Sequence, residues 1–171
     1  MRNLIGLIAS LKNSTKTRKY SFQFNETGVL LDGDLQLILR KTYPGNSLNT
    51  TVPEYIFEMV STNHIGSIMG KISLRIGQTE QIRKYAGHIG YSVDPNFRGN
   101  RLAARSCLLI LPLALSHGIN PVWITCNPEN HASRSTCKII GAKLIETIPI
   151  PSNNPLYNWD TKWKCRYRLD L

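Results

Sequence analysis

Side chains alternate along two neighbouring stretches in the middle of the chain. In residues 55–60, Tyr55, Phe57 and Met59 occupy every second position, and most even-numbered positions of residues 68–76 are isoleucine or leucine. Successive side chains of a strand point to opposite faces, so a period of two residues predicts two strands. The intervening residues 63–66 have the composition of a turn. We therefore expect an antiparallel hairpin.

A strand and a long helix follow this hairpin. After a loop at 77–86, residues 88–93 are typical of a strand, and an apolar helical pattern runs from about 99 to 117. Pro112 lies inside that pattern and predicts a kink or a division of the helix, whereas Gly118 is typical of a helix end. The other expected elements are strands at 35–40, 122–126, 144–148 and 163–169, a helix at 130–140, and irregular connections at 42–53 and 149–154. This order is a meander followed by a βαβ unit.

Length and composition favour one domain. A chain of 171 residues that is 42% hydrophobic can build one core and is short for two. We expect a single domain over residues 1–171, with residues 1–34 as a basic N-terminal segment of uncertain structure. In that segment a helical spacing of leucines at 4–11 gives way to a Ser/Thr/Lys-rich stretch and then to a loop or strand at 20–24.

The charge and the cysteines limit the partners. A net charge of +10 attracts nucleic acid, acidic proteins, anionic lipid or an anionic cofactor, and does not choose among them. The four cysteines lie far apart without C-x-x-C spacing, so we expect buried free thiols, with neither a zinc site nor a disulfide scaffold. No apolar run is long enough to span a membrane, which predicts a cytoplasmic protein without a membrane partner. The basic, acid-free residues 1–25 also share their composition with organelle transit peptides.

The junction between strand 88–93 and the following helix predicts an anion site. Backbone N–H groups at a helix start, together with the positive end of the helix dipole, bind phosphate without a charged side chain. Arg98 and Arg101 add charge there. The helix dipole disfavours cations at this end, so two arginines favour a bound ligand over a merely solvated surface.

Two segments resemble a known family. Residues 89–103, IGYSVDPNFRGNRLA, resemble the strand and phosphate loop of the GNAT superfamily of N-acetyltransferases, whose loop reads R/Q-x-x-G-x-G/A. Residues 127–142, NPENHASRSTCKIIGA, resemble the family segment N-x-x-(A/S)-x-x-x-(Y/L)-x-x-x-G-F, and the branch most similar in motif contains the ribosomal-protein N-acetyltransferases. With the hairpin, the resemblance spans residues 55–148.

This resemblance implies a fold and an activity. The fold is α+β, with a central mixed β-sheet that has an antiparallel N-terminal meander, a parallel pair at the cofactor cleft and flanking helices. The activity is transfer of an acetyl group from acetyl-CoA to a primary amine on a small molecule or polypeptide, by direct attack on the thioester; a homodimer is compatible with the sequence. The implied cofactor residues are Tyr91, Ser92 and Val93 beside the thioester, Arg98, Gly99, Asn100, Arg101, Leu102 and Ala103 at the pyrophosphate, and Asn127, Asn130 and Ser133 at pantetheine.

Two residues and one segment depart from the family pattern. Arg101 stands where glycine is usual, so either the loop does not need glycine's freedom or the binding geometry differs, and the arginine could reach a coenzyme phosphate. Cys137 replaces a tyrosine that protonates the leaving thiolate in many members, which leaves the proton donor unassigned; we expect Cys137 to be a small buried side chain. Residues 42–54 show no helical pattern where members have helices over the acceptor site. We expect an acceptor site that is either open or built partly from the N-terminal thirty residues, and such a site would suit a bulky acceptor.

Catalytic candidates and a second function complete the expectations. His88 and Glu58 are candidate general bases, although a structural role is the commoner one for either residue. Tyr157 and Trp159 are candidates for the acceptor cleft or for surface packing. The alternative function is a basic nucleic-acid or protein-binding module with a vestigial or regulatory coenzyme site. It would use the N-terminal cations and the strand face of Lys164, Arg166 and Arg168, whose default reading is a solvated face.

Overall fold

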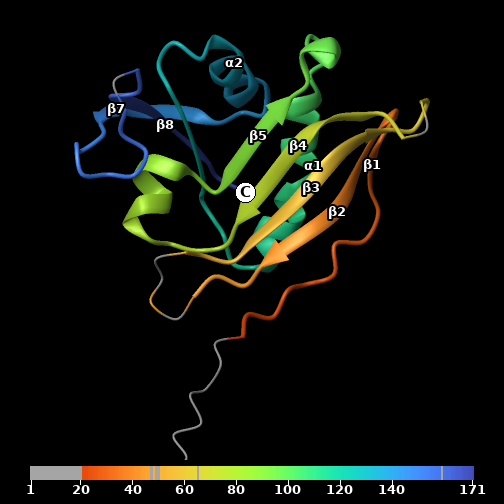
Figure 1. Ribbon diagram of the computed structural model, residues 1–171, viewed down its shortest axis with the longest axis horizontal. Helices are drawn as coiled ribbons and strands as arrows, with labels where there is room; N and C mark the ends of the chain where they lie inside the picture. The colour runs from red at the N-terminus through yellow and green to blue at the C-terminus, as the bar shows by residue number, and fades with distance from the viewer. Residues whose placement is uncertain (1–20, 47, 49–50, 65, 159) are drawn as a thin grey trace, which may run out of the picture.

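The first sheet is an antiparallel meander. The computed structural model describes residues 21–171 except 47, 49, 50, 65 and 159. Five strands pair in chain order, and Figure 1 shows them as a twisted fan. They are β1 (Leu30–Asp32), β2 (Leu35–Tyr43), β3 (Glu54–Ser61), β4 (Ile68–Arg75) and β5 (Ile89–Val93).

The predicted antiparallel hairpin is confirmed as the pair β3 and β4. Tyr55 lies opposite Leu74 and Phe57 opposite Ile72. Tyr55, Phe57 and Met59 are fully buried on one face of β3, while the intervening residues are only partly buried. Burial of one face therefore produces the alternation seen in the sequence.

The second sheet has three strands in the order β6, β8, β7, and all its pairings are antiparallel. The strands are β6 (Val122–Cys126), β7 (Lys143–Pro149) and β8 (Trp163–Leu169). The α+β class is confirmed, but the predicted parallel pair is not a hydrogen-bonded pair within the described residues, since β5 and β6 belong to different sheets. Immediately before β5, His88 N–H donates to Trp123 O on β6 at 2.7 Å, and the two strands part beyond that bond.

Helix α1 (Leu102–Ser116) covers one face of the first sheet, and Figure 1 views the sheet from the other face. It buries Ile110, Leu113 and Ala114 and continues as a single element through Pro112, so of the two predicted alternatives, a kink or a division, the division does not occur. The N–H that proline lacks would have bonded to the carbonyl of Leu108, whose side chain is exposed, so water can satisfy that carbonyl. The helix ends before Gly118, as predicted, where the backbone turns to φ 70°.

Three shorter helical elements complete the fold. Helix α2 (His131–Ile139) confirms the second predicted helix, and η2 (Pro95–Phe97) is a 3-10 turn directly after β5. A π-helical turn, η1 (Ile82–Ala86), lies in the segment predicted as loop. Its Tyr85 carbonyl accepts a hydrogen bond from Thr125 Oγ1 at 2.7 Å, so this turn is attached to β6.

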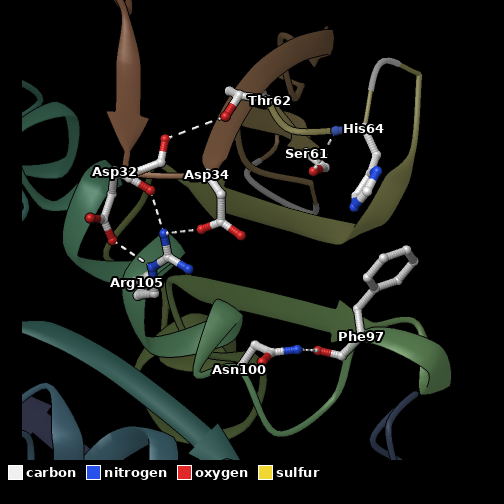
Figure 2. Close-up of polar contacts among 9 residues, drawn as sticks. Asp32, Asp34, Ser61, Thr62, His64, Phe97, Asn100 and Arg105 are labelled. Carbon is white, nitrogen blue, oxygen red and sulfur yellow. Dashed lines mark hydrogen bonds and ion pairs between the residues drawn. The ribbon is translucent and has the colours of Figure 1, made fainter.

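Arg105 ties α1 to the turn between β1 and β2. Its guanidinium lies 2.6 Å from Asp32 Oδ2 and 2.8 Å from Asp34 Oδ1, and Figure 2 shows it between the two carboxylates. The main-chain N–H of Arg105 donates to Arg101 O at 3.0 Å. The loop before α1 is therefore attached to a helix turn that is itself anchored to the sheet.

The segment before β1 packs on the core without regular structure. Phe24 meets Tyr55 edge-on with ring centroids 4.8 Å apart, and Asn25 N–H donates to Tyr55 Oη at 2.7 Å. The strand predicted near residues 20–24 is not formed at 21–24, and the helical spacing at residues 4–11 falls outside the described residues. The connection after β2 has no helix in its described part, as predicted, although β2 extends to Tyr43.

Candidate active site

The loop between β5 and α1 presents backbone N–H groups to one place. Asp94 accepts the N–H of Asn96 at 3.0 Å, which holds the turn η2, and the chain then passes through Gly99 at φ 90° to Arg101 at φ 53°. Within the described part of the chain, the N–H groups of residues 99–103 donate to no protein acceptor. The loop is therefore a nest of free donors at the positive end of α1.

Arg101 is the one described residue other than glycine with a positive φ. It is the N-cap of α1 and adopts the left-handed conformation that glycine adopts without steric cost. The interpretation that this loop does not need glycine's freedom is therefore wrong: the backbone keeps the left-handed conformation, and an arginine adopts it at a cost of roughly 1–2 kcal/mol.

A cavity of about 610 Å³ opens above this loop. Its walls are the end of β5, the loop, the start of α1 and one face of α2. It brings together ten of the predicted cofactor residues: Tyr91, Ser92, Val93, Arg98, Gly99, Arg101, Leu102, Ala103, Asn130 and Ser133.

Two predicted cofactor residues lie outside this cavity. The Asn100 side chain donates to Phe97 O at 3.2 Å and braces the loop from within, as Figure 2 shows. Asn127 lines a second cavity. Sequence reasoning missed Phe97 and four residues of α2. The four residues of α2 lie on one face of the helix, because they recur at helical spacing, and this spacing could have identified them from the sequence. They are Ala132, Ser135, Thr136 and Ile139.

The start of α2 is fixed by Asn130. Its side-chain oxygen accepts the N–H of Ser133 at 3.0 Å, which makes it the N-cap. Ser133 is thereby held opposite β5, where its Oγ lies 2.8 Å from Tyr91 Oη. Burial raises the pKa of Tyr91 above its ordinary value, so this phenol stays protonated at neutral pH.

A second cavity of about 320 Å³ shares Tyr91, Asn130 and Ser133 with the walls of the first. It lies where β5 and β6 part, and β4 and β8 complete its walls. The polar side chains found only in this second cavity are Arg75, Thr125, Asn127 and Lys164.

A family model described as an acetyltransferase (GNAT) domain matches residues 9–143. The chain belongs to the GNAT acetyltransferase family. Members of this family use acetyl-CoA as the acetyl donor.

Solved structures show the same fold. MccE, a Microcin C7 self-immunity acetyltransferase whose structure contains acetyl-CoA and AMP, is 20% identical with a TM-score of 0.53, over 69% of this chain and 61% of its own. A putative ribosomal-protein-serine acetyltransferase from Vibrio cholerae is 14% identical with a TM-score of 0.59, over 84% and 97%. RimL, a ribosomal alpha-N-protein acetyltransferase in complex with coenzyme A, is 14% identical with a TM-score of 0.60, over 84% and 98%. The chain thus spans about three fifths of MccE. Comparison with curated proteins finds no match.

The structure places the two predicted bases of this GNAT domain away from both cavities. His88 is fully buried; its Nε2 lies 2.9 Å from Gly77 O, and its Nδ1 accepts the N–H of Trp123 at 2.9 Å. Burial lowers the pKa of His88 to about 4. Both ring nitrogens therefore bond to backbone atoms. His88 was predicted to be a general base, but in the structure it connects the two sheets. Glu58 lies on β3, and its Oε2 is 2.6 Å from Nε of Arg40 on β2.

Cys137 of the GNAT domain is fully buried inside α2, as predicted. Burial raises the pKa of its thiol to about 12. The position that carries a tyrosine in many members therefore offers no group to either cavity.

The default reading of the β8 cations as one solvated face holds for Arg168, which is exposed, but not for Arg166, which is buried. Arg166 is 8% exposed, is paired with Glu146, and stacks over the Trp123 ring at 4.4 Å. Arg168 is paired with Asp170 at 2.7 Å, and Lys164 faces the second cavity. The N-terminal cations and Trp159 fall outside the described residues, and Tyr157 lines neither cavity. Among the helices that the structure describes, none is long and apolar enough to cross a membrane.

Proposed function

We propose that this GNAT domain transfers the acetyl group of acetyl-CoA to a primary amine. The observation that carries the proposal is that two neighbouring cavities share Tyr91, Asn130 and Ser133 in their walls. One cavity begins at a loop built for an anion, and the other opens between the parted strands β5 and β6. A thioester that enters from the loop and an amine that enters from the second cavity would meet at Tyr91.

The larger cavity fits coenzyme A. Its volume of about 610 Å³ lies within the roughly 300–1,000 Å³ of small-molecule sites. The free N–H groups of residues 99–103, the positive end of α1 and the side chains of Arg98 and Arg101 would hold the pyrophosphate. Asn130 and Ser133 on α2 face β5 across the course of pantetheine.

The reaction needs an attacking amine, a polarised carbonyl and a protonated leaving group. Acetyl-CoA supplies an activated thioester, and the amine nitrogen forms its bond to the carbonyl carbon as the carbon–sulfur bond breaks. The edge of β5 that faces away from β4 pairs with no strand of the described residues, so alternate N–H groups there can stabilise the oxyanion. Tyr91, hydrogen-bonded to Ser133, is the donor we assign to the sulfur.

Among the residues that the structure describes, no helix covers the acceptor side. No helix lies between β2 and β3 in the described part of that connection, and Figure 1 shows no helix in front of the first sheet. A side without a covering helix supports acceptors from small amines to the end of a polypeptide.

Calorimetric titration with acetyl-CoA, followed by measurement of CoA release with a panel of amines, tests the proposal. Arg98→Ala and Arg101→Ala should each weaken acetyl-CoA binding by about tenfold, since each removes a charged contact with phosphate. Lys143→Ala removes one charge from an exposed position on β7 and serves as the matched control. Absence of acetyl-CoA binding by the wild-type chain would overturn the proposal.

A further inference from the structure

Lys164 is a half-buried cation without a counter-ion. It lies on β8, and its Nζ donates to Asn127 Oδ1 at 2.7 Å. No carboxylate of the described residues lies within ion-pairing distance of it. An ammonium has three N–H donors, and one neutral amide oxygen uses only one of them. Two donors and the whole charge therefore remain for a ligand.

The environment makes this charge costly. Burial lowers the pKa of Lys164 below its ordinary value, because the half-buried ammonium has lost part of its hydration. A bound anion would return the lost stabilisation.

Lys164 faces the cavity in which the amine is proposed to bind. That cavity shares Tyr91 with the proposed coenzyme cavity, so a ligand on Lys164 would lie on the other side of the residue that we assign to the leaving sulfur. The other cation that lines this cavity, Arg75, already has protein partners. It pairs with Glu54 at 3.1 Å and donates to the carbonyls of Ala86 and Gly87 at 3.3 Å. Lys164 is therefore the cation of this cavity that is available to a ligand.

The walls of this cavity contain no acidic side chain among the described residues. A polyamine or another polycation would find two like charges there and no counter-charge. The net charge of +10 for the whole chain adds to this effect, because it repels polycations and attracts anions.

We propose that the acceptor is an amine that also carries an anionic oxygen group, a carboxylate or a phosphate, and that Lys164 binds this group. The inference rests on the proposed acetyl transfer and names its acceptor class. Lys164 is a specificity-determining residue, because it binds the part of the acceptor that does not react.

The same charges assist the reaction. A cation near the acceptor ammonium favours its neutral form, and the proton leaves to solvent before attack. The neutral amine then forms the carbon–nitrogen bond and the carbon–sulfur bond breaks. The sulfur takes a proton from Tyr91, the nitrogen gives up its second proton, and Tyr91 is reprotonated from that nitrogen or from solvent, so the products are an amide and the thiol of CoA. This electrostatic effect suits a cavity whose described lining residues include no glutamate, aspartate or histidine.

Matched acceptors of equal length test the proposal. The rate of CoA release is measured with 4-aminobutanoate, butylamine and 1,4-diaminobutane, with shorter and longer members of each series, and with O-phosphoethanolamine against ethanolamine. The best anionic acceptor should exceed its neutral counterpart in kcat/KM by about tenfold or more, and the diamine should be the poorest of its set.

Variants assign the preference to Lys164. Lys164→Met should abolish the preference by raising KM for the anionic acceptors, whereas the loss of the charge's effect on the amine pKa should lower the rates of neutral and anionic acceptors alike. Lys164→Arg should retain most of the preference. Calorimetry should give Lys164→Met an acetyl-CoA affinity within about twofold of wild type, which also shows that the variant is folded. Lys143→Met, with the same loss of charge outside both cavities, should keep the preference.

The outcomes separate the two proposals. Equal rates with neutral and anionic amines, a preference for the diamine, or weaker acetyl-CoA binding in Lys164→Met would overturn the role of Lys164 and leave acetyl transfer standing. No acetyl-CoA binding and no CoA release with any amine would overturn the proposed function, and this inference with it.

Discussion

Tyr91 Oη lies 2.8 Å from Ser133 Oγ, and this hydroxyl pair connects β5 to α2 in the walls that the two cavities share. Tyr91 is part of a strand and Ser133 of the first turn of a helix, so backbone structure fixes both groups. In the proposed reaction, this pair would donate a proton or a hydrogen bond to the leaving thiolate. It supplies from β5 the group that Cys137 cannot supply from α2.

We predict that Tyr91→Phe lowers kcat by about 100-fold, within the range for loss of a general acid. The acetyl-CoA dissociation constant should change by less than about threefold, because the ring remains in place. Single-turnover measurement of amide formation checks the first value and calorimetry the second. Ser133→Ala is the companion variant, and it should lower kcat by a smaller factor because the phenol of Tyr91 remains. Wild-type kcat in Tyr91→Phe would show that the thiolate leaves without this donor.

The left-handed backbone of Arg101 predicts opposite effects on stability and binding. Arg101→Gly should raise the free energy of unfolding by about 1 kcal/mol, because glycine adopts φ 53° without strain. It should weaken acetyl-CoA binding by about tenfold, because a cation beside the pyrophosphate is lost. Urea denaturation and calorimetry measure the two effects.

Arg101→Ala separates the backbone from the charge. It should lose affinity as Arg101→Gly does, but gain no stability, since alanine keeps the Cβ that strains this conformation. Equal stability of the two variants would mean that the left-handed conformation stores no strain.

The sequence predicted more of the lining of the first cavity than of the second, for a physical reason. The phosphate loop is a local structure, so residues 93–103 contain their own signal: a strand end, a turn and a helix start. The second cavity has no local signal. Asn127 and Lys164 are 37 residues apart, and Arg75 is supplied by the other sheet. Only the packing of the two sheets brings them together.

The burial of Arg166 could not be predicted from the sequence for the same reason. A strand whose cations face water and a strand whose cations face Glu146 and Trp123 have the same alternating sequence. His88 is similar, because the partners of its ring, Gly77 and Trp123, are 11 and 35 residues away. Period and composition place such a side chain on a face and do not identify what covers that face.

His88 predicts a loss of stability in mild acid. Its pKa is lowered in the folded protein from 6.5 to about 4, so between these values the unfolded chain binds a proton that the folded chain does not. The free energy of unfolding should therefore fall as pH decreases from 6.5 to 4 and lose no more from this residue below 4. The loss at pH 5 should be about 2 kcal/mol. Burial also lowers the pKa of His117, which acts in the same direction.

Urea denaturation at pH 7 and pH 5 measures this dependence. His88→Gln, which keeps an N–H donor and has no titrating ring, should reduce the difference between the two pH values by about 2 kcal/mol. His64→Gln changes an exposed histidine and should alter that difference by no more than about 0.5 kcal/mol. An unchanged difference in His88→Gln would show that another group controls the acid response.

The burial of the four cysteines predicts that their thiols react slowly with thiol reagents in the folded protein. Cys107, Cys126, Cys137 and Cys165 are each 5% exposed or less, and burial raises the pKa of the first three. Thiol reagents react with the thiolate, so burial and a raised pKa both slow labelling. Labelling with an aromatic disulfide at pH 8 should be slower in the native protein than in denaturant by on the order of a hundredfold or more. Fast labelling of one native thiol would contradict this, and Cys126→Ser would show whether it comes from the cysteine that lines the second cavity.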